Sequence, residues 1–182
     1  MVWLLAFALA SGLGGPGDAP ADVPTVAANR SALAASLLAN ESRRVRSTNG
    51  RISKLLAEGV RRSRTFADIV SQVHETNVIV YLEPVHDLPG GMSGRIVLQT
   101  VAGGQRYLRV QVRATLPTDQ TISVIAHELR HALEVAADTS VVDDDGLVAL
   151  YKRIGHVSYG ERGYDTDAAD ATGRIVRGEL IG

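Results

Sequence analysis

The chain of 182 residues contains no cysteine. This absence excludes disulfide bonds, zinc sites with cysteine ligands and catalysis by a thiol nucleophile. Any bound metal ion must therefore be held by histidine, aspartate or glutamate side chains.

Aromatic residues are scarce, at 4% of the chain, and neither sign of charge is in excess, because the formal net charge is −1. The hydrophobic content of 45% is enough for a core, which must then be aliphatic. The balanced charge argues against an electrostatic preference for nucleic acid or for an anionic membrane, so we expect neither as a partner. The length suits one domain, and the chain has no internal repeat.

The apolar run at the N-terminus, from Met1 to Ala10, is too short to span a bilayer. A segment rich in Gly, Pro, Ala and Asp follows it up to Pro24. This pattern is typical of a secretory signal peptide cleaved after Ala10 or Ala21, although its start has no Lys or Arg. We predict a signal peptide or disordered N-terminus over residues 1–24 and a single domain over residues 25–182. The mature chain would have no membrane span and be secreted or periplasmic, or cytoplasmic if the segment is not a leader.

The hydrophobic periods predict an α+β domain. Helical spacing comes first, then three β-branched or alternating runs, the last two of which flank Gly103-Gly104 and so predict a hairpin. We expect a small three-stranded sheet between N-terminal and C-terminal helices, with the third strand near a sheet edge. The predicted helices cover residues 27–46, 52–60, 66–73, 118–137, 146–154 and 165–180, and the strands cover 78–82, 95–101 and 107–113.

The segment His127-Glu128-Leu129-Arg130-His131 has the pattern H-E-x-x-H within a predicted helix. Two histidines four residues apart project from one face of a helix, so both imidazoles can reach one Zn²⁺ ion. Glu128 is then placed beside the metal, where it can take a proton from a metal-bound water. A random shuffle of this composition produces roughly 0.006 such matches, so an accidental motif is rare.

This motif resembles that of the zincin metallopeptidases, and the resemblance covers roughly residues 78–180. In the gluzincin branch of that family the third zinc ligand is a Glu on a later helix, within E-x-x-A-[DN]. The matching segment here is Tyr164-Asp165-Thr166-Asp167-Ala168-Ala169-Asp170, with Asp165 at the Glu position and Ala169 at the last position. The resemblance thus implies Asp165 as third ligand, with Asp167, Asp170 and His156 as alternatives. The metzincin extension is absent, because Glu134 and Ala137 stand where it has Gly and His.

Several other residues have two interpretations. Glu134 is either a support for a histidine N–H or a solvated partner of Arg130. Tyr159, Tyr164 and His156 are either donors to a tetrahedral oxyanion or packing residues. The run Asp143-Asp144-Asp145 lacks the spacing of a calcium loop, so we interpret it as a helix cap.

Together these observations predict a zinc-dependent hydrolase, most simply a metallopeptidase, with His127, His131 and Asp165 as ligands and Glu128 as base. A peptide or protein substrate would add to the sheet beside residues 105–113. Two alternatives are a non-catalytic zincin-like binding module with weak or no metal and a metal hydrolase acting on another bond. The sequence leaves the oligomeric state open.

Overall fold

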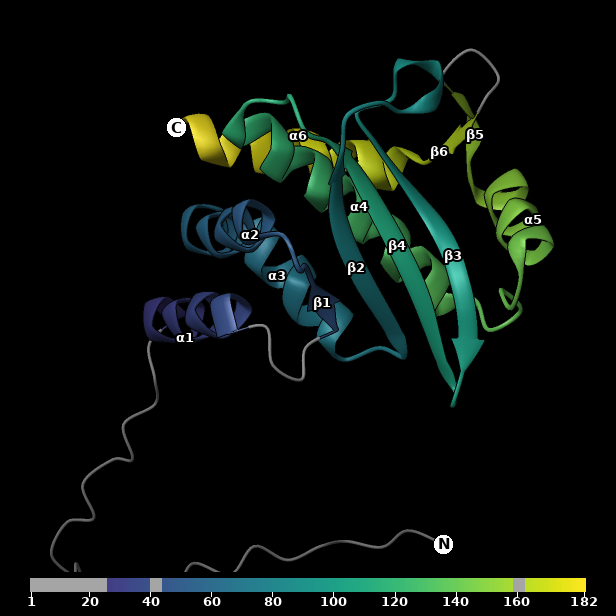
Figure 1. Cartoon of the computed structure of the whole chain (residues 1–182), viewed down its shortest axis with the longest axis horizontal. Coiled ribbons are helices and arrows are strands. Elements are labelled where there is room, and N and C mark those ends of the chain that lie inside the picture. The colour runs from purple at the N-terminus through teal and green to yellow at the C-terminus, as the bar shows by residue number, and fades with distance from the viewer. Residues whose placement is uncertain (1–25, 40–43, 159–162) are drawn as a thin grey trace, which may run out of the picture.

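The computed structural model describes residues 26–39, 44–158 and 163–182, and it shows an α+β domain as predicted (Figure 1). The predicted leader over residues 1–24 lies outside the described residues. Within those residues, no helix is long and apolar enough to cross a membrane. The elements are α1 (Val26–Ala39), β1 (Val45–Arg46), α2 (Gly50–Arg62), α3 (Arg64–His74), β2 (Val78–Val85), a 3₁₀ turn η1 (Pro89–Gly91), β3 (Gly94–Ala102), β4 (Gln105–Arg113), α4 (Thr118–Ala137), α5 (Asp144–Ile154), β5 (His156–Ser158), β6 (Gly163–Asp165) and α6 (Asp167–Ile181).

The main sheet has four strands and not the predicted three, in the order β1-β2-β4-β3, because β1 lies within the predicted first helix. Strand β4 is parallel to β2 on one side and antiparallel to β3 on the other. The predicted place of β4 near a sheet edge is therefore wrong, and so is the prediction that a peptide adds beside residues 105–113. The strand at that edge is β3.

The hairpin between β3 and β4 is confirmed. Gly103 and Gly104 at its turn both have positive φ, at 57° and 73°. Two consecutive residues of this kind form the two-residue turn whose twist matches the twist of the strands, and glycine adopts it without steric cost. Because β2 pairs with β4, this tight turn sends β3 to the outer edge of the sheet.

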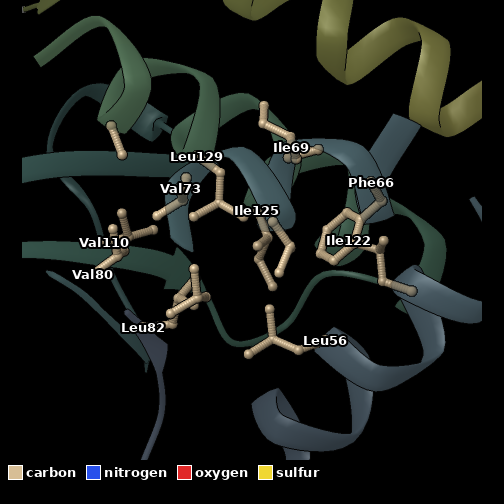
Figure 2. Close-up of a cluster of buried hydrophobic side chains, with 14 of the residues drawn as sticks. Leu56, Phe66, Ile69, Val73, Val80, Leu82, Val110, Ile122, Ile125 and Leu129 are labelled. Atoms are coloured by element: carbon tan, nitrogen blue, oxygen red, sulfur yellow. The ribbon is translucent and has the colours of Figure 1, made fainter. Parts of the chain in front are cut away.

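Helix α4 covers one face of the sheet and fills the centre of the core. Leu108, Val110 and Val112 of β4 point to this face, and each is at most 1% exposed. Figure 2 shows Val80, Leu82 and Val110 from the sheet facing side chains of α3 and of α4, the latter being Ile122, Ile125 and Leu129. Burial of one complete aliphatic side chain stabilises a fold by about 1.5–3 kcal/mol, so this layer fixes where α4 lies.

The C-terminal end of α4 is capped by a buried arginine of β4. The guanidinium of Arg106, in a residue only 3% exposed, donates hydrogen bonds to the carbonyls of Val135, Ala136 and Asp138 and to Asn77 Oδ1. The last carbonyls of a helix have no partner within the helix, so a cation there satisfies them and favours the helix dipole. This cap attaches α4 to the central strand.

The predicted end of the first helix needs correction. The first helix ends at Ala39, and Val45–Arg46 forms β1, because Val45 is buried against the core beside β2. Helix α4 begins at Thr118 as predicted, and no side chain caps it. Caps are confirmed at Ser63 for α3 and at Asp143 for α5, where the side chain accepts from Gly146 N–H.

The C-terminal segment also differs from its prediction. Part of the predicted loop over residues 155–163 belongs to a second sheet of two strands, β5 and β6. Asp165 is the last residue of β6, and α6 begins two residues later. The side chain of Thr166 accepts from Ala169 N–H and caps α6, which leaves Asp165 extended.

Candidate metal centre

The two histidines of the motif lie on one face of α4, as predicted. Their Nε2 atoms are 3.2 Å apart, and the rings meet edge to face with centroids 4.8 Å apart. His131 is 4% exposed, and the side chain of His127 is 15% exposed. Helical spacing brings the rings to one side, and the aliphatic packing of the opposite side of α4 fixes which side that is.

Asp165 closes the group from a distant part of the chain. Its Oδ1 atom lies 3.2 Å from Nε2 of His127 and 3.4 Å from Nε2 of His131. The side chain is 5% exposed, and the same oxygen accepts the N–H of Thr166 at 2.8 Å. One ligand atom from each of the three residues lies within 4.8 Å of the others, so the three could hold one metal ion.

The alternative third ligands lie elsewhere. The side chain of Asp167 is fully exposed and lies 3.9 Å from Nδ1 of His156, whose side chain is half exposed. Asp170 is closer, but its Oδ1 atom lies 3.7 Å from Nδ1 of His127, the ring nitrogen that does not face His131. Among these candidates the structure brings only Asp165 to the two Nε2 atoms.

Glu134 supports His131 from the other side of the ring. Its Oε2 atom lies 2.8 Å from Nδ1 of His131, and its Oε1 atom accepts the hydroxyl of Thr166 at 2.7 Å. Arg130 lies 3.9 Å away, which makes it the weaker partner of Glu134. A donor hydrogen on Nδ1 leaves the lone pair of Nε2 free for a cation. Thr166 follows Asp165, so this contact also positions the third member of the group.

The protonation of the three groups indicates that the site stabilises positive charge. Burial is the largest influence on the pKa of His131 and lowers it, but hydrogen bonds to Asp165 and Glu134 outweigh burial and raise this pKa to about 10. The pKa of His127 is raised against burial by its contact with Asp165. In turn, the two imidazoles hold the pKa of Asp165 far below its usual range, although burial opposes this. Such a group favours a cation between the rings and the carboxylate.

Glu128 lies beside the group and is 4% exposed. Burial raises the pKa of its carboxyl, and the two nearby imidazoles oppose this shift. Its Oε1 atom packs so closely on β3 that a Cβ atom at Gly94 would come within 2.5 Å of it. A larger residue at this position would have to displace the side chains of Glu128 and Val124, so Gly94 is a position next to the site that the sequence analysis missed. The sequence signal that could have identified Gly94 is a glycine directly before a predicted strand.

A cavity of about 250 Å³ opens over the site between β3, α4, α5 and β6. Its walls include Ile96 from β3 and Leu147, Val148 and Tyr151 from α5, so they are largely apolar. Tyr164 also lines the cavity, whereas His156 does not, and Tyr159 lies outside the described residues. The cavity leaves one side of the group open while the opposite side of α4 remains packed.

Tyr151 is a second residue that the sequence analysis missed. Its ring meets that of His131 edge to face with centroids 5.2 Å apart, and its hydroxyl donates to the backbone carbonyl of His131 at 3.4 Å. Burial, followed by the nearby carboxylates, raises the pKa of this phenol. The hydroxyl therefore stays protonated and can donate a hydrogen bond. The residue lies twenty positions after His131, and nothing in its local pattern predicted the contact.

Comparison of the chain with protein-family models, curated proteins and solved structures finds no match, so the resemblance to zincins rests on the motif and the arrangement of the site.

Proposed function

We propose that this protein is a zinc-dependent hydrolase that cleaves peptide bonds, with a zincin-like fold. One observation carries the proposal: the atoms of His127, His131 and Asp165 converge at the floor of a cavity, next to the buried carboxylate of Glu128. An active-site helix that carries H-E-x-x-H beneath a small sheet, with the third ligand from a later segment, is the arrangement that the resemblance implies.

The donor set suits Zn²⁺. Two imidazole nitrogens and one carboxylate oxygen are ligands that zinc accepts, and three protein ligands are typical of catalytic zinc sites. The Nδ1 contact of His131 with Glu134 also matches the hydrogen bond that orients metal-binding histidines. When bound, zinc would supply Lewis-acid chemistry, polarising the scissile carbonyl and making water easier to deprotonate.

Glu128 would move the proton. Its carboxylate takes a proton from the attacking water, whose oxygen bonds to the carbonyl carbon. The C–N bond then breaks, and Glu128 passes the same proton to the leaving amine nitrogen. Burial raises the pKa of Glu128, which makes it a better base than an exposed glutamate and allows it to hold the proton between the two steps.

The edge strand β3 would orient the substrate. Gly94, Arg95 and Ile96 of β3 line the cavity, and β3 pairs with β4 on one side only. An extended peptide can add to such an edge through main-chain hydrogen bonds, which position the chain without requiring particular side chains. The apolar wall formed by Leu147, Val148 and Tyr151 favours an apolar side chain next to the cleaved bond.

Metal analysis combined with the variant Glu128→Gln tests the proposal. The purified chain should bind one zinc ion and cleave a mixture of unstructured peptides. Glu128→Gln should retain zinc and lower turnover by a factor of about 10² or more, because it removes the base and no ligand. If the chain binds zinc but Glu128→Gln retains full activity, this mechanism is wrong. If it neither binds zinc nor cleaves any peptide, the non-catalytic binding module replaces the hydrolase.

A further inference from the structure

A second cavity adjoins the site on its other side. It has a volume of about 260 Å³ and shares Gly94, His127 and Glu128 with the cavity over the site. It differs in its remaining walls, which come from the first half of α4 and from α6. The two cavities therefore meet at Glu128, and a substrate that crosses the site from one enters the other.

Two arginines of α6 line this second cavity. Arg174 and Arg177 are three positions apart, both are exposed, and neither makes a hydrogen bond or ion pair with another described residue. Helix α6 comes close to the site at Gly173, where an added Cβ atom would be 3.4 Å from Cβ of His127. Arg174 thus directly follows a residue of α6 that packs on His127. Two guanidinium groups at helical spacing can hold one carboxylate through charge-assisted hydrogen bonds.

An acidic residue in the same wall does not neutralise the pair. Asp170 lines the cavity, but its carboxylate lies 3.7 Å from Nδ1 of His127. It is also a single charge against two. The lining contributed by α6 therefore has a net positive charge that a substrate anion can compensate, while Glu128 of α4 adds a negative charge where the two cavities meet.

The direction of β3 indicates which end of a peptide reaches these arginines. The strand begins at Gly94, beside Glu128, and runs away from the second cavity towards Ala102. A peptide added antiparallel to β3 would run from the Ala102 end of the strand to the Gly94 end. Its C-terminal part would then pass Ser93 and enter the second cavity. A parallel peptide would present its N-terminal ammonium group to Arg174 and Arg177, and these like charges repel.

We infer that Arg174 and Arg177 bind the C-terminal carboxylate of the substrate, so that the enzyme removes a short C-terminal fragment from a peptide. This inference rests on the proposed hydrolase. It adds the substrate class, a peptide with a free C-terminus lying antiparallel to β3. The fragment released carries the carboxylate bound by the two arginines.

Two pools of peptides test the inference. Both contain the same random eight-residue sequences with an acetylated N-terminus, and they differ only in a C-terminal carboxylate or amide. The zinc-loaded protein should cleave the carboxylate pool at least about tenfold faster, at positions clustered near the C-terminus, because loss of one charge-assisted carboxylate contact has about this effect. The double variant Arg174→Ala/Arg177→Ala should lower the rate on the carboxylate pool to its rate on the amide pool. The double variant Arg61→Ala/Arg64→Ala is the control, since it removes the same two charges from exposed residues of α2 and α3 that do not line the second cavity.

The outcomes separate the two proposals. Equal cleavage of both pools by the unmodified protein overturns this inference and leaves the hydrolase standing. Cleavage at a fixed distance from internal Asp or Glu, in both pools, assigns the arginines to a side-chain carboxylate and also overturns it. If neither pool is cleaved, the hydrolase fails and this inference fails with it. Binding of the two pools to Glu128→Gln gives a readout independent of turnover, with tighter binding of the carboxylate pool expected.

Discussion

Each end of α6 is attached to the rest of the protein through a glutamate that accepts several hydrogen bonds. The two glutamates differ in what their hydrogen-bond partners contact. At the C-terminal end, Glu179 accepts from the hydroxyls of Ser63 and Thr65 and from the N–H of Thr65. At the N-terminal end, Glu134 accepts from Thr166 and from His131.

The difference lies in what surrounds each glutamate. Glu179 accepts its hydrogen bonds from Ser63, the cap residue of α3, and from Thr65 in the first turn of α3. These polar groups therefore satisfy one another without a ligand. Around Glu134, the contacts lead to His131, whose Nε2 atom converges with Asp165 Oδ1 and with Nε2 of His127. Three groups with lone pairs directed at one point need a proton or a metal ion between them. The Glu179 cluster is thus completed by the chain itself, whereas the cluster around Asp165 is a candidate site for a cation.

The largest expected effect is at the incomplete cluster. Asp165→Ala should lower zinc affinity roughly a hundredfold, because it removes one of three protein ligands. Competition with a chromophoric chelator measures this. Asp167→Ala is the matched control, since its carboxylate is fully exposed and lies away from the converging atoms. An equal loss in both variants would remove the distinction between ligand and neighbour.

Glu134→Gln should have an intermediate effect. The neutral amide cannot accept from both His131 and Thr166 as the carboxylate does, so His131 is held less firmly and its Nε2 atom becomes a weaker donor. We expect zinc affinity to fall about tenfold, measured by the same competition. Zinc affinity equal to that of the unmodified protein would assign Glu134 to structure alone, like Glu179.

The smallest effect is at the completed cluster. Glu179→Gln should lower the free energy of unfolding by about 1 kcal/mol or less and leave zinc affinity unchanged. Urea unfolding as a function of pH checks this. Burial favours a higher pKa for Glu179, but the hydrogen bonds from Ser63 and Thr65 outweigh it and lower this pKa below the ordinary value of 4.5. The contribution is therefore present in full above pH 4.5 and is lost as the pH falls through the folded pKa, where the unmodified protein and the variant converge.

The sequence predicted one part of the site well. Four-residue spacing within an amphipathic helix determines that His127 and His131 share a face, and no tertiary information is needed for that. The element that carries Asp165 was predicted wrongly, because Thr166 competes for the cap position and ends the extended segment before the helix begins. Gly94 and Tyr151 were missed because their contacts join segments far apart in the chain, which periodicity does not record.

The sheet shows the same limit. Alternation along residues 107–113 predicted the strand and its buried face correctly. The same alternation occurs in a central and in an edge strand, so it does not determine strand order. The order follows from the parallel pairing of β2 with β4, which is a contact between segments separated by β3.

The arginine cap on α4 bears on whether the metal site would be formed before a metal ion binds. Arg106 holds the end of the histidine-bearing helix to β4, and Glu134 with Thr166 holds the same helix to α6. The ligand positions are thus determined by a fold with its own aliphatic core. Small zinc domains, in contrast, are unfolded until the metal arrives. In this chain zinc would bind to a preorganised site, so it would raise the melting temperature by mass action, by an amount that grows with the logarithm of the free zinc concentration, and chelation would leave a folded protein behind.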